Sequence, residues 1–144
     1  YGAGHGGVEA MLLCGVASIS NIVSAVMINS GTMSAQLATL DAEKAADTAA
    51  ALSALWTTPS LTFFAGGVER IIAVVLHLSL SILVFQSIRK KSQKDLFNAY
   101  LFHFVIDSLS VLLSAVASVW VVELVVALVT GGAVLMAKYA CMEE

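Results

Sequence analysis

The chain has 144 residues, of which 59% are hydrophobic and 12% are charged, with a formal net charge of −3. Its mean hydropathy is +0.92. Soluble domains carry about a quarter charged residues, so this composition excludes an ordinary water-exposed surface, and the absence of a basic face interleaved with aromatic residues excludes nucleic acid as an expected partner. A single integral-membrane domain over residues 1–144, in contact with a lipid bilayer, is expected.

Four apolar runs are long enough to cross a membrane. A spanning helix needs about 20 apolar residues to cross ~30 Å. The runs occupy residues 7–29, 61–86, 96–118 and 121–139. Neither Pro nor Gly separates the last two runs, so Trp120 and Glu123 mark the expected membrane interface between them, with Glu123 solvated. The sequence predicts an all-α polytopic transmembrane helix bundle.

The connections between the runs predict a surface helix and an orientation. The first connection contains the stretch DAEKAADTAAALSAL, which is typical of a surface helix over residues 41–55 with Asp41 as its cap. The second connection, residues 87–95, is rich in Arg and Lys, so the positive-inside rule places this loop in the cytoplasm. The chain starts at Tyr1 without a Met, which favours a fragment that lacks N-terminal helices.

Two histidine–carboxylate pairs lie in the apolar runs at helical i, i+4 spacing. They are His5 with Glu9 and His103 with Asp107, and this spacing places both members of a pair on one helix face. A charged side chain in hydrocarbon costs at least ~2.5–3.5 kcal/mol, so such residues persist mainly where they face a polar cavity. The pairs therefore predict a shared polar site, although pairs that only stabilise the bundle would show the same pattern.

A third polar segment, FFAGGVERIIAVVLH, carries Glu69, Arg70 and His77. Arg70 and His77 fall within about 20° of the same helix face, and Glu69 lies about 80° from His77. Because Arg70 is always charged, it needs a carboxylate partner in the membrane. A Glu–Arg pair that locks two helices together is one interpretation of Glu69 and Arg70, and a functional role is the other.

Depth along the helices tests whether these side chains can meet. At ~1.5 Å per residue, His103, Asp107 and His77 all lie roughly 10–16 Å above the basic loop. We therefore expect one cavity in the cytoplasmic half of the bundle. The residues expected to face it are Glu9, His77, His103 and Asp107, supported by His5, Glu69 and Arg70.

Such a site favours the hydrolysis of a peptide bond inside the membrane. Burial makes a carboxylate a stronger base, and imidazoles can bind an oxyanion or protonate a leaving amine. A divalent metal such as Zn²⁺ held by histidines and carboxylates is the alternative. We expect no metal or other cofactor, because Arg70 opposes a cation and the sequence lacks a compact pair of histidines.

Three motifs carry a resemblance to a known family. GHGGVEA (4–10), AGGVERIIAVVLH (65–77) and HFVID (103–107) resemble the motifs of the YhfC family of bacterial membrane peptidases. That family is similar to the type II CAAX prenyl endopeptidases, also called ABI or CPBP, and to the APH subunit of gamma-secretase. The resemblance implies an intramembrane endopeptidase of the bacterial cytoplasmic membrane, which acts on a peptide or membrane-protein substrate.

The resemblance also implies roles for individual residues. Glu9 would activate water, and His77 and His103, the latter with Asp107, would stabilise the oxyanion. Glu69 is the competing candidate for the base. Because the APH relatives act as scaffolds, a non-catalytic scaffold or transport bundle with a histidine–acid cluster is the alternative function.

Overall fold

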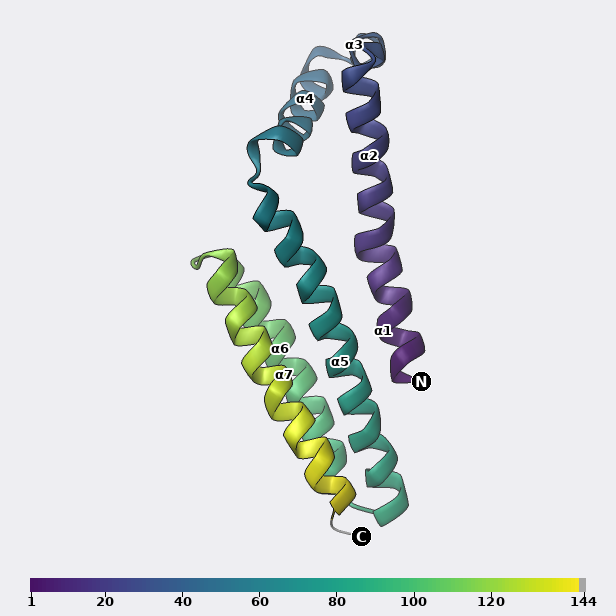
Figure 1. Ribbon diagram of the computed structural model, residues 1–144, viewed down its shortest axis with the longest axis vertical. Coiled ribbons are helices and arrows are strands. Elements are labelled where there is room, and N and C mark those ends of the chain that lie inside the picture. The colour runs from purple at the N-terminus through teal and green to yellow at the C-terminus, as the bar shows by residue number, and fades with distance from the viewer. Residues whose placement is uncertain (143–144) are drawn as a thin grey trace.

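A computed structural model describes residues 1–142, and all regular elements in this range are helices (Figure 1). Four helical stretches are long and apolar enough to cross a membrane. They are Gly2–Asn29, Ser60–Lys90, Gln93–Ser114 and Val119–Met142. The predicted all-α transmembrane bundle is confirmed.

The first stretch consists of three consecutive segments. They are α1 (Gly2–Ala10), the π-helical turn η1 (Met11–Gly15) and α2 (Val16–Asn29). This stretch begins five residues earlier than the predicted start at residue 7, so His5 lies inside the helix. In the described part of the chain α1 packs against α5, whereas α2 contacts only η1, α3 and α4.

A short connector joins the first two spans. Gly31 adopts a left-handed conformation with φ of 76°, and α3 (Thr32–Leu37) and α4 (Ala42–Thr57) follow. Asp41 caps α4: its carboxylate accepts hydrogen bonds from the Lys44 ammonium at 2.8 Å and from the Lys44 backbone N–H at 2.9 Å. These two bonds hold the pKa of Asp41 below its usual range. The predicted surface helix over residues 41–55 is therefore present.

The remaining spans form the packed part of the bundle. They are α5 (Ser60–Lys90), α6 (Gln93–Ser114) and α7 (Val119–Met142). Lys91, with φ of 53°, ends α5 in a left-handed turn. The turn between α6 and α7 covers residues 115–118, close to the predicted interface.

Helix α5 is the centre of the bundle because it packs against α1, α6 and α7 (Figure 1). Small residues of α7 allow this helix to lie close to α5 and α6. The buried core residues are Leu76, Leu80, Leu83, Ala99, Ile106, Val126, Ala133, Ala137 and Ala140. Large apolar side chains also cover the outside, Phe104 and Leu128 among them, which is the arrangement expected where lipid is the solvent.

Candidate functional site

Two glycines bring α1 into contact with α5 at the level of His77. A Cβ atom on Gly6 would lie 3.0 Å from His77 Cδ2, and one on Gly2 would overlap the His77 carbonyl oxygen. Gly4 and Gly7 face open space. The Gly-rich segment thus permits close approach through one face only, the face of Gly2 and Gly6.

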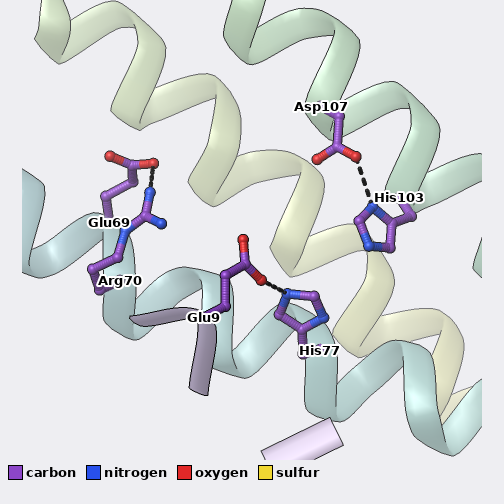
Figure 2. Close-up of polar contacts among 6 residues, drawn as sticks. All are labelled: Glu9, Glu69, Arg70, His77, His103 and Asp107. Atoms are coloured by element: carbon purple, nitrogen blue, oxygen red, sulfur yellow. Dashed lines mark hydrogen bonds and ion pairs between the residues drawn. The ribbon is translucent and has the colours of Figure 1, made fainter. Parts of the chain in front are cut away.

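This approach joins Glu9 to His77. The His77 Nε2 and Glu9 Oε2 atoms lie 2.7 Å apart, and the two residues come from α5 and α1 (Figure 2). The His77 side chain is 9% exposed and that of Glu9 is 38% exposed. A carboxylate from one helix therefore meets a buried imidazole from another.

Two further imidazoles flank His77. The His5 ring lies 4.9 Å from it and the His103 ring 5.5 Å from it, measured between ring centroids, and both contacts are edge-on. His103 Nδ1 lies 2.9 Å from Asp107 Oδ2 one turn further along α6 (Figure 2). Three helices thus bring together the three histidines of the chain, each in contact with at least one other.

Glu69 and Arg70 form an ion pair with each other on α5, two turns before His77 (Figure 2). Because both belong to one helix, this pair does not itself lock two helices together. On α7, the Glu123 carboxylate lies near this pair, where Glu69 repels it and Arg70 attracts it. Glu123 is half-buried and its Oε2 atom is fully buried, so the prediction of a solvated Glu123 is wrong. The one sequence feature that indicated burial was the position of Glu123 inside the predicted apolar run over residues 121–139.

Two cavities lie on either side of the imidazoles. The larger, here called the groove, has a volume of about 700 Å³ and is lined by His5 and mostly apolar residues of α5 and α6. The smaller, here called the chamber, has a volume of about 300 Å³ and is lined by Glu9, Asp107 and the Glu69–Arg70 pair. His77 and His103 line both cavities.

A candidate metal centre lies between α1 and α5. One ligand atom each from His5, Glu9 and His77 lies within 4.8 Å of the other two. Two imidazoles and one glutamate are a ligand set that catalytic zinc sites use, with a further coordination position left for water or substrate. The donor set therefore fits a divalent transition metal, and the Glu9 carboxylate would offset part of its charge.

Comparison with known proteins decides the family. The family described as "YhfC intramembrane metalloprotease" matches residues 1–126. The chain belongs to this family. It is also 37% identical over 131 residues to a protein of Bacillus subtilis (strain 168) named "Uncharacterized membrane protein YhfC".

The aligned region covers 90% of the chain and 50% of that relative, so the chain spans about half the length of its YhfC relative. No solved structure matches the chain significantly. The family and the four spans agree that this is an integral membrane protein.

Membership of a metalloprotease family contradicts the expectation of a site without metal. Both reasons for that expectation fail in the structure. The Arg70 charge is paired with Glu69, so it is not an isolated cation beside the site. His5 and His77 are far apart in the sequence, but the crossing of α1 and α5 makes them neighbours.

Proposed function

We propose that the protein is a membrane-embedded, metal-dependent endopeptidase that hydrolyses a peptide bond of a peptide or membrane-protein substrate. The observation that carries this proposal is the convergence of His5, Glu9 and His77 ligand atoms within 4.8 Å, in a chain of a metalloprotease family. A bound divalent ion such as Zn²⁺ supplies Lewis acidity, which lowers the pKa of water and polarises a carbonyl group.

In this proposal His5, Glu9 and His77 hold the metal, and His103 handles protons. Asp107 accepts a hydrogen bond from His103 Nδ1–H, which leaves Nε2 as the basic nitrogen. That nitrogen can take a proton from water as the oxygen attacks the peptide carbonyl. It can then deliver the proton to the amine nitrogen as the C–N bond breaks. The 5.5 Å between the His77 and His103 rings keeps this imidazole next to the metal ligands.

Metal analysis and cleavage assays on the purified full-length protein test the proposal. The substrate probe is a library of quenched fluorescent peptides, offered to protein in vesicles of phosphatidylethanolamine and phosphatidylglycerol. The wild type should contain about one equivalent of zinc or a similar metal, and a chelator should abolish cleavage. His77→Gln should lose both metal and cleavage, because it removes a buried ligand.

His103→Gln is the matched control on the neighbouring helix. It should keep the metal but cleave about 10²–10⁴-fold more slowly, which is the range for loss of general acid–base catalysis. Wild-type protein that binds no metal, or a His77→Gln variant that binds metal as tightly as the wild type, would contradict the proposed centre. Full metal occupancy without cleavage of any peptide would favour a non-catalytic bundle.

We also propose that the loop over residues 87–95 faces the cytoplasm, on the strength of its basic residues. A hydrophilic thiol reagent applied from one side of the membrane tests this, with single cysteines at Ser92 and Thr48. The two positions should label from opposite sides. Labelling of both from the same side would overturn the topology.

A further inference from the structure

The candidate site separates two largely apolar cavities that differ in charge, because the chamber is lined by Glu9, Arg70 and Asp107 among others and the groove, within the described residues, by no carboxylate, Arg or Lys. His77 and His103 line both the groove and the chamber. His5 lines only the groove, and Glu9 lines only the chamber. Two reactants can therefore reach the same imidazoles from different sides.

The groove is suited to an apolar ligand. Apart from the imidazoles, its polar side chains are few: Ser81 and the tyrosines Tyr1 and Tyr100. The apolar side chains that line it include Leu80, Val84, Phe85, Ile88, Leu96 and Phe104. A water molecule is stable in a cavity only where two to four polar partners surround it, so most of this groove offers water too few partners.

The chamber differs from the groove because it carries charged side chains among apolar ones such as Leu76, Ile106 and Val126. Its lining includes the charged side chains of Glu9, Glu69, Arg70 and Asp107, together with the hydroxyl of Ser110. Its volume of about 300 Å³ is enough for on the order of ten water molecules at ~30 Å³ each. Charged groups at this depth need solvation, because an ion pair in hydrocarbon compensates only part of the cost of removing its charges from water.

A buried carboxylate on the neighbouring helix adds to the charge beside the chamber. Glu123 Oε2 is fully buried and accepts no hydrogen bond from any residue in the described part of the chain. It belongs to a carboxylate that interacts electrostatically with Glu69 and Arg70, two residues of the chamber wall. Glu123 is not among the residues that line the chamber, so it contributes charge beside the chamber and is not assigned a contact with the water inside it.

We propose that the chamber is a water reservoir that delivers the hydrolytic water to the His77–His103 wall, while the groove receives an apolar segment of the peptide substrate. This proposal rests on the proposed peptidase function. It assigns a role to Glu69, Arg70 and Ser110, which hold water in the chamber rather than bind metal or peptide. Separation of the two reactants solves the problem of supplying water to a bond held in an apolar groove.

Cysteine accessibility tests the water content of the chamber independently of catalysis. In full-length protein with Cys14 and Cys141 replaced by serine, single cysteines are placed at Ser110, in the chamber wall, and at Ser108, which lines neither cavity. Both native serines are half-buried on α6. The probe is a small cationic methanethiosulfonate. It is applied to protein in phosphatidylethanolamine–phosphatidylglycerol vesicles that have been permeabilised, so that the reagent reaches both faces of the membrane.

Ser110→Cys should react at least about tenfold faster than Ser108→Cys, because the reagent attacks the thiolate, which forms in water and not in hydrocarbon. Equal labelling rates at the two positions would overturn the proposal that the chamber holds water.

A pair of filling variants on α5 provides the second measurement. Ala73 lies one turn before His77 in the chamber wall, and Val84 lies two turns after it in the groove wall. Ala73→Leu should slow the labelling of Ser110→Cys several-fold, whereas Val84→Phe should leave it unchanged. Equal protection by both variants would show that the cavities are not separate and would overturn the proposal.

The same two variants separate the roles in catalysis. Ala73→Leu should lower kcat with little change in KM, and Val84→Phe should raise KM, in the vesicle assay with quenched fluorescent peptides. The reverse pattern would refute the assignment of water and peptide to the two cavities. If no peptide is cleaved at all, the proposed function fails, and the labelling contrast still decides whether the chamber holds water.

Discussion

Replacement of Gly6 by alanine tests whether the contact of α1 with His77 holds the candidate metal ligands together. Alanine is favoured over glycine inside a helix by roughly 0.5–1 kcal/mol. Against this, the new Cβ would lie 3.0 Å from Cδ2, 3.2 Å from Cβ and 3.3 Å from Cγ of His77. Overpacking of this kind costs about 1–3 kcal/mol, so the variant should lose roughly 0–2.5 kcal/mol of stability.

The displaced imidazole should also bind metal less tightly. Its Nε2 atom is only 2.7 Å from Glu9 Oε2, so a shift of a few tenths of an ångström changes the spacing of two candidate ligands. Disruption of the support around a metal ligand typically costs about 10–100-fold in affinity. The measurements are the thermal unfolding midpoint in detergent and the zinc dissociation constant of full-length protein.

Gly4→Ala is the matched control, because a Cβ atom there meets nothing within 4 Å. It should keep the zinc affinity of the wild type and should gain stability from its helix propensity. If Gly6→Ala proved as stable as Gly4→Ala and bound zinc equally well, the reasoning about close approach would be refuted.

Three other predictions follow from the contacts around the site and the connector. Asp107→Ala should slow cleavage by about 10–100-fold through the loss of His103 orientation with zinc content unchanged, and loss of zinc on metal analysis would contradict the assignment. Glu69→Ala should leave the Arg70 charge without its partner and destabilise the protein by about 1–3 kcal/mol in equilibrium unfolding, whereas the double variant with Arg70→Met should lose less than the sum of the single losses. The lowered pKa of Asp41 means that its stabilisation of α4 is present above the unfolded carboxylate pKa of ~3.9 and is lost as the pH falls through the lower folded value. The protection factors of the α4 amides, which compare measured exchange with the intrinsic rate at each pH, should therefore fall below about pH 4 in the wild type but not in Asp41→Asn, and a flat wild-type profile of these factors would refute the role of the cap.

The spans and the histidine–acid pairs were predictable because they depend on local patterns. Hydropathy over about 20 residues finds a spanning helix without knowledge of its neighbours. The i, i+4 spacing of His103 and Asp107 likewise predicts their 2.9 Å contact from the geometry of one helix. Counting depth from the basic loop also placed His77 and His103 at one level, and their rings are in contact.

The candidate metal ligand set was not predictable in this way, because it depends on how two helices cross. His5 and His77 are separated by most of the first span, the connector and half of α5. The His5 and His77 rings meet only if the right glycines of α1 face α5. In the structure Gly2 and Gly6 face α5, whereas Gly4 does not. Glu123 was misjudged for a related reason: a carboxylate near a helix end is solvated or buried according to the neighbouring helix, which hydropathy does not report.

The π-helical turn at Met11–Gly15 divides the first span into α1 and α2, and it sets the rotation of one half about the helix axis relative to the other. A π turn holds an extra residue, and each residue rotates an α-helix by about 100°. Removal of one residue from this turn would therefore swing the face of His5 and Glu9 a quarter-turn or more relative to α2, with almost no change in hydropathy. The orientation of α1, which carries the candidate ligands, is set by its packing on α5. Because α2 makes no contact with α5, the face that α2 presents to lipid or to other helices can differ from the face of His5 and Glu9.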